Sequence, residues 1–170
     1  MINSAAKLSK LFFPVLFALI LCGCQKSESS ALPASPFSDA AWEYTAEDVM
    51  AYEGSEPSTY DSVYGGICYT YPKTYQERQG TIKYMFDDKE RLMCVAWTCA
   101  ADEEQELFDF YDRIEQSVNS QTGETGSSSH AGRVWYKDDG NIILSLMITS
   151  DLKALQYAYL HPDVSSPPKE

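Results

Sequence analysis

The sequence predicts an α+β fold in the order αβββ-αβββ, with two helices packed on one face of an antiparallel sheet. Two helix patterns are each followed by three stretches in which apolar and polar residues alternate. Runs of strands separated by single helices are typical of an antiparallel sheet with helices on one side. Hydrophobic residues make up 44% of the chain, enough for a packed core. We therefore expect a single α+β domain over residues 42–161.

The first half of this domain is predicted to be a helix and a three-stranded meander. Thr45 can cap the helix, Asp48 stands at the capping-box position, and Gly54 ends it. Alternating stretches at 66–71, 81–86 and 92–98 then predict three strands.

The second half repeats this order. Acidic residues at 102–104 begin a helix that ends before Gly123. Its apolar residues recur at helical spacing: Leu107, Phe110, Tyr111, Ile114 and Val118. A polar, glycine-rich loop is expected over 119–132, and strands are expected at 133–137, 142–149 and 154–160.

Residues 1–23 have the layout of a secretory signal peptide. Lys7 and Lys10 precede an apolar run at 11–21, which is shorter than the ~20 residues that span a membrane. An ordinary cleaved signal usually ends in an A-x-A-like site, which this chain lacks. The sequence Leu21-Cys22-Gly23-Cys24 instead resembles the lipobox of bacterial lipoproteins. That resemblance implies cleavage after residue 23 and a lipid anchor, with its palmitate-type acyl chains, on Cys24. The protein would then face the periplasm or exterior from the cell membrane or outer membrane.

The amino-acid composition distinguishes both ends of the chain from the domain, and the net charge excludes some classes of partner. Residues 24–41 are rich in Ser, Ala and Pro and predict a flexible tether, and 162–170 predict a loose tail. Loss of Lys7 and Lys10 with the signal changes the net charge from −12 to −14. Such a surface repels nucleic acid and anionic headgroups, so we expect no nucleic-acid partner and membrane attachment through Cys24 only.

Three cysteines remain in the predicted domain: Cys68, Cys94 and Cys99. Cys94 and Cys99 differ in parity along one strand and should face opposite sides of the sheet. If Cys68 and Cys94 lie on the outer strands of the meander, about 9–10 Å separates them, beyond the ~7 Å that a disulfide allows. We expect these cysteines to be small buried residues, and their spacing matches no zinc-binding pattern. The sequence does not decide whether they are oxidised or reduced.

No side-chain pattern predicts catalysis, a metal site or a cofactor. His130 follows three serines, but no acid is placed to orient its imidazole and no nucleophile-elbow sequence is present. The acidic residues at the start of the second predicted helix fan outward instead of converging on one ion: Asp102, Glu103, Glu104 and Glu106. We therefore expect no enzyme, and an enzyme that uses His130 is the third hypothesis for function.

Tyrosines concentrate in the first predicted sheet region. Tyr60, Tyr64 and Tyr75 lie toward its loops and are the hardest to bury, which makes them candidate binding aromatics. Core packing is the alternative for this set.

The element order, with the helix entry Thr-x-Glu-Asp-Val at 45–49, is similar to small exported bacterial proteins of the β-lactamase-inhibitor and outer-membrane-assembly-lipoprotein type. The resemblance implies a domain that binds another protein, and it implies no individual binding residue. We expect a lipid-anchored module that binds a protein or an envelope component. A receptor for small molecules or glycans is the alternative.

Overall fold

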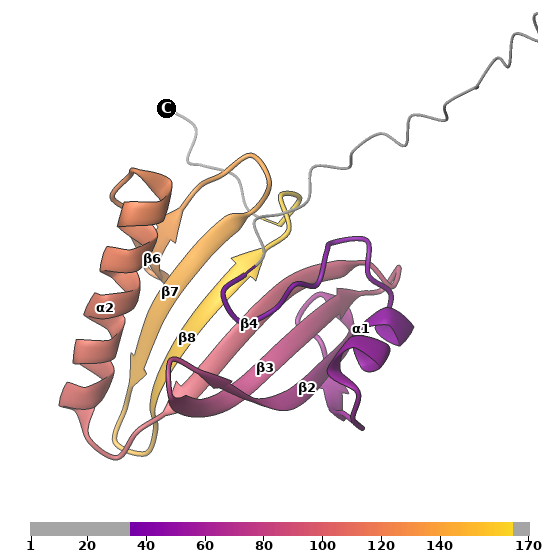
Figure 1. The fold of residues 1–170 in the computed structure, drawn as a ribbon, viewed down its shortest axis with the longest axis horizontal. Coiled ribbons are helices and arrows are strands. Elements are labelled where there is room, and N and C mark those ends of the chain that lie inside the picture. Colours follow the sequence, from indigo (N-terminus) through magenta and orange to yellow (C-terminus); the bar gives the residue numbers. More distant parts are fainter. Residues whose placement is uncertain (1–34, 165–170) are drawn as a thin grey trace, which may run out of the picture.

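The computed structural model describes residues 35–164, which form two helices and an eight-stranded antiparallel sheet and so confirm the α+β class. The elements are α1 (Ala46–Glu53), β1 (Ser58–Asp61), β2 (Gly65–Tyr75), β3 (Arg78–Asp87), β4 (Leu92–Ala100), α2 (Glu104–Thr122), β5 (Ser127–Ser129), β6 (Gly132–Trp135), β7 (Asn141–Ile148) and β8 (Lys153–Leu160). The strand order is β1-β2-β3-β4-β8-β7-β6-β5. Two αββββ units therefore meet at β4 and β8 (Figure 1).

The predicted order αβββ-αβββ is wrong because each unit has four strands. The prediction missed β1 and β5, the two edge strands, in which every residue is exposed. They lack the apolar alternation that predicts a strand, and backbone pairing with β2 and β6 holds them in the sheet instead. The expected loop at 119–132 likewise contains the end of α2 and all of β5.

Strand β2 extends to Tyr75, beyond its predicted end at residue 71. β1 pairs only with residues 67–70 of β2, so Pro72 lies on an unpaired stretch of its edge, where proline is tolerated. The β2–β3 hairpin then turns through Gln76 and Glu77, with φ angles of 45° and 65°. Two-residue hairpins need positive φ at these positions and usually have Asn or Gly there, so this turn has no sequence signature.

Helix α1 begins as predicted, and both helices end as predicted. Thr45 and Asp48 form a capping box, and Gly54 closes α1 with a left-handed φ of 64°. Gly123 closes α2 in the same way, with a φ of 73°. The buried side of α2 consists of Leu107, Phe110, Ile114 and Val118. Both helices contribute buried side chains to one large hydrophobic cluster.

The predicted tether at 24–41 is too long, because its last residues belong to the folded domain. Phe37 and Ala40 are 5% and 8% exposed and pack in the large cluster. The predicted tail at 162–170 also begins too early, since Asp163 pairs with Arg91 at 3.2 Å and Val164 packs against a smaller cluster. The predicted signal peptide, Cys24 and residues 165–170 lie outside the described residues. Within residues 35–164, no helix combines the length and hydrophobicity needed to cross a membrane.

Candidate functional site

The two faces of the sheet carry different kinds of side chain. Residues directly opposite across neighbouring strands point to the same side, so the register defines rows that share a face. We call the side away from the large cluster the open face. Its three rows are Cys68, Met85, Cys94, Leu160 and Asn141; Thr70, Lys83, Ala96, Ala158 and Ile143; and Pro72, Thr81, Thr98, Gln156 and Ser145.

A cavity of about 530 Å³ lies on the open face over β3, β4, β8 and β7. Its polar lining comes from six side chains: Gln79, Thr81, Lys83, Thr98, Ser145 and Gln156. Met147 and Leu152, which are 53% and 42% exposed, add an apolar rim. The described lining residues come from strands and the β7–β8 turn, with none from a helix. A volume of ~300–1,000 Å³ is typical of ligand sites.

The three rows of the open face contain no carboxylate, although the chain has 25 Asp and Glu residues. Their only charged side chain is Lys83. Among residues 35–164, no carboxylate lies within ion-pair distance of Lys83. Depletion of charge distinguishes the centre of a protein interface from the rest of the surface. The open face therefore has the composition of a binding surface on an otherwise acidic domain.

The three candidate tyrosines do not form one site. Tyr75 lies on the opposite face, where its ring meets those of Phe37 and Trp97 at 5.8 and 5.4 Å, so it is a core residue. Tyr60 is 49% exposed and lies opposite Cys68, and Tyr64 packs against the small cluster that contains Cys94. The residues that line the cavity were missed because Thr, Ser, Gln and Ala in a strand carry no signal of a site.

The cysteines lie where the sequence places them. Met85 stands between Cys68 and Cys94 in the register, which confirms their separation by one strand. Cys94 and Cys99 belong to different hydrophobic clusters, as their parity predicts. All three thiols are free in the structure. Burial, reinforced by the nearby Cys68, raises the pKa of the Cys94 thiol to about 12.

We expect the folded protein to lose stability above about pH 9. The Cys94 pKa is raised from 9.0 to about 12 on folding. Its contribution to stability is therefore complete below the unfolded value and is lost as the pH rises from 9 toward 12. Burial also raises the pKa of Tyr159 to about 12, which extends the decline above pH 10. For each such group, the free energy of unfolding falls by at most about 1.4 kcal/mol per pH unit.

Urea denaturation at intervals between pH 7 and 11 measures this decline. Cys94→Ala removes the thiol with little change in volume, so the decline between pH 9 and 10 should be shallower than in the wild type. An unchanged slope in this variant would show that Cys94 is not the group responsible.

His130 does not line the cavity. It is exposed in the turn between β5 and β6, and the serines that precede it form β5. Glu106, from the acidic run, pairs with Arg78 at 3.4 Å at the surface. Within the described part of the chain, no group of three His, Cys, Asp or Glu side chains could hold a metal ion.

No family model matches this chain, and neither a curated protein nor a solved structure is significantly similar to it.

Proposed function

We propose that this protein is a lipid-anchored, exported binding module without catalytic activity, and that its open face binds another protein of the cell envelope. The observation that supports this proposal is the carboxylate-free sheet face on a strongly acidic domain. In this arrangement both helices would cover the opposite face, because both contribute buried side chains to the same cluster. A lipid on Cys24 would hold the domain beside its partner at the membrane.

The side chains of the open face suit a protein partner. Ala96 and Ala158 are buried, at 0% and 1% exposure, so a partner would contact the partly exposed row beside them. Thr81, Thr98 and Gln156 supply neutral hydrogen-bonding groups. Burying such groups costs little free energy when the partner forms hydrogen bonds with them. Lys83 can form an ion pair with a carboxylate of the partner.

Site-specific photo-crosslinking in intact cells tests this assignment. A photoreactive amino acid replaces either Gln156 on the open face or Gln116 on the exposed surface of α2. We expect position 156 to capture a defined partner and position 116 to capture none. Thr98→Arg should reduce capture at position 156 at least tenfold without changing the melting temperature. Equal capture from both positions, or capture that Thr98→Arg leaves unchanged, would contradict the proposal.

A small-molecule or glycan receptor is the second candidate, because the volume and hydroxyl lining of the cavity also suit a ligand. Thermal-shift screening against glycans and metabolites separates the two candidates. A ligand at 100 times its Kd stabilises the folded state by about 2.7 kcal/mol and should raise the melting temperature by several degrees. Such a shift, lost in Thr98→Arg, would favour the receptor.

A further inference from the structure

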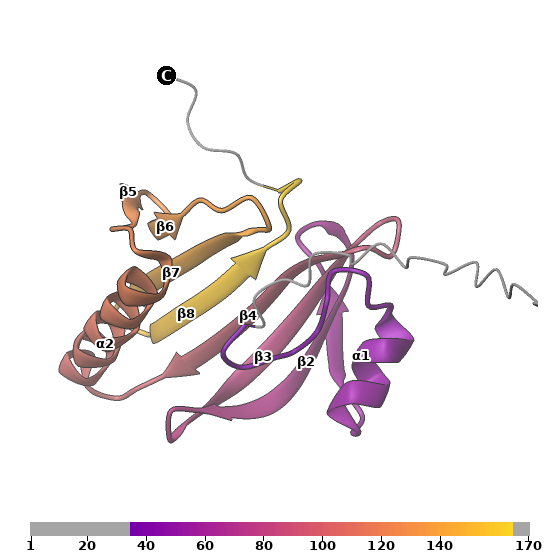
Figure 2. The same ribbon diagram turned by 45° about the horizontal axis from the view of Figure 1, so that its top comes forward.

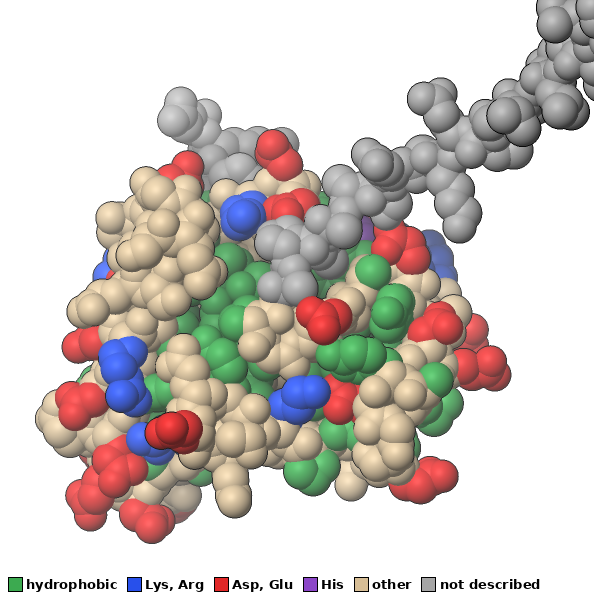
Figure 3. Space-filling view, viewed as in Figure 1, with side chains coloured by type: hydrophobic (Ala, Val, Ile, Leu, Met, Phe, Trp, Pro, Cys, Tyr) green, Lys and Arg blue, Asp and Glu red, His purple; other side chains and the backbone are tan. Residues whose placement is uncertain are grey.

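A segment without helix or strand crosses the sheet on the side opposite the open face. Residues 35–41, which we call the strap, pass over the middle of the sheet between α1 and α2 (Figures 1 and 2). In Figure 3, hydrophobic side chains are visible at the surface between α2 and the strap. The strap therefore lies in a groove whose apolar floor continues beyond the part that it covers.

Phe37 fixes the strap in this groove. Its ring meets Tyr75 of β2 and both Tyr157 and Tyr159 of β8 edge-on, with centroid distances of 5.8, 5.3 and 5.8 Å. These three rings come from both αββββ units and together form one aromatic pocket. Edge-to-face contact is a favoured geometry for aromatic pairs, so the pocket is shaped for an aromatic side chain.

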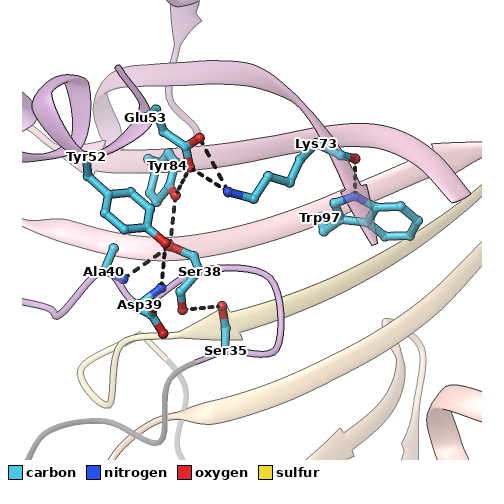
Figure 4. Close-up of polar contacts among 9 residues, drawn as sticks. All are labelled: Ser35, Ser38, Asp39, Ala40, Tyr52, Glu53, Lys73, Tyr84 and Trp97. Atoms are coloured by element: carbon cyan, nitrogen blue, oxygen red, sulfur yellow. Dashed lines mark hydrogen bonds and ion pairs between the residues drawn. The ribbon is translucent and has the colours of Figure 1, made fainter. Parts of the chain in front are cut away.

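A polar cluster beside this pocket binds the residue after Phe37. The Tyr84 hydroxyl donates to the Glu53 carboxylate at 2.5 Å and accepts from the Ser38 hydroxyl at 2.8 Å (Figure 4). Lys73 pairs with the same carboxylate at 3.3 Å, and only 8% of the Glu53 side chain is exposed. The groove thus offers an aromatic pocket next to a buried acceptor for a hydroxyl group.

Release of the strap from this groove would break no hydrogen bond between strands. Its described backbone bonds are local, with Ser38 N donating to Ser35 O at 3.1 Å and Ala40 N to Ser38 Oγ at 3.1 Å. Its remaining amide contact reaches a side chain, since Asp39 N donates to the Tyr52 hydroxyl at 3.2 Å. Within residues 35–164, the strap pairs with no strand. Its composition, apart from Phe37, is that of a linker.

We infer that this groove is a peptide-binding site and that the strap is its intramolecular ligand. An extended segment of a partner protein, with an aromatic residue followed by Ser or Thr, takes the place of Phe37 and Ser38. Such a segment can also cover the apolar floor that the strap leaves exposed. The strap competes with it at the high effective concentration of a covalently linked ligand. This site lies on the opposite side of the sheet from the open face and does not depend on the function proposed for that face.

The test measures binding of a labelled peptide with the sequence of residues 35–42 to the mature full-length chain, by fluorescence anisotropy. We expect saturable binding to Phe37→Ala, whose own strap no longer fills the pocket. Binding to the wild type should be at least tenfold weaker, because its strap occupies the groove. The same peptide with its Phe replaced by Ala should bind neither protein.

Equal binding to the two proteins, or no binding to a folded Phe37→Ala chain, would overturn the inference. Hydrogen exchange of the wild-type chain provides a second test that does not require this variant to fold. The Asp39 amide should exchange at least tenfold faster than amides of β4, because the strap opens while the sheet stays closed. Equal protection of these amides would make the strap part of the core and would also overturn the inference. A third outcome is a wild-type chain that forms a stable dimer and a Phe37→Ala chain that is a monomer. It would mean that the groove binds the strap of a second copy, and it would overturn the inference that a partner protein binds there.

Discussion

Trp97→Ala should lower the free energy of unfolding by about 3–5 kcal/mol, the range for removing a buried aromatic side chain. Trp97 is fully buried on β4, where it lies opposite Tyr157 of β8 at the junction of the two units. Its indole Nε1 donates to the Lys73 carbonyl at 2.9 Å (Figure 4). The substitution leaves a cavity and removes the hydrogen bond to the Lys73 carbonyl, so the effect is large beside a total stability of ~5–15 kcal/mol.

Chemical denaturation at pH 7 measures this loss, and a second tryptophan provides a matched control. Trp42 is only partly buried, and its Nε1 donates to the Asp139 carbonyl at 3.0 Å near the edge of the core. Trp42→Ala should therefore cost clearly less than Trp97→Ala. Trp97→Phe should also cost less than Trp97→Ala, because most of the apolar volume is kept. Equal losses at the two tryptophans would contradict the central position of Trp97.

Cys24→Ser should move the protein from the membrane fraction to the soluble fraction. The lipobox resemblance implies more than one acyl chain on Cys24, and two chains would anchor the protein stably whereas one binds only marginally. Without lipid, a chain cleaved after residue 23 would carry a net charge of −14, because cleavage would remove two lysines from a total of −12, and anionic headgroups would repel it. We expect almost complete release, with the melting temperature unchanged.

Cell fractionation with metabolic labelling by a fatty-acid analogue measures this release. Cys22→Ser is the matched control, because it changes the neighbouring cysteine and leaves the proposed lipid acceptor in place. This control should stay labelled and membrane-bound. A Cys24→Ser chain that still sediments with membranes would refute the lipoprotein assignment.

The sequence predicted the elements that local rules specify. Thr45 and Asp48 predict the start of α1 because a capping box involves residues three apart in the chain. The buried side of α2 is likewise predicted by spacing along one helix. The separation of Cys68 and Cys94 could be predicted because hairpin-linked strands are neighbours in the sheet.

The edge strands and the turn at Gln76 and Glu77 could not be predicted in this way. The residues of β1 are exposed on every side, and pairing with β2 alone makes them a strand. The turn has positive φ at residues that rarely adopt it, because the long ladder between β2 and β3 continues to its last pair, Tyr75 and Arg78. In both cases the neighbouring strand overrides local preference.

The class of the domain, the ends of its helices, its longer strands and the proposed lipid anchor could all be predicted from the amino-acid sequence. Each of these depends on residues close together in the chain. The tertiary structure alone decided the junction of two units at β4 and β8, the rows of the open face and the burial of Phe37 in a segment with the composition of a linker. These features depend on contacts between residues far apart in the sequence, such as Phe37 with Tyr157 and Tyr159, and only packing brings such residues together.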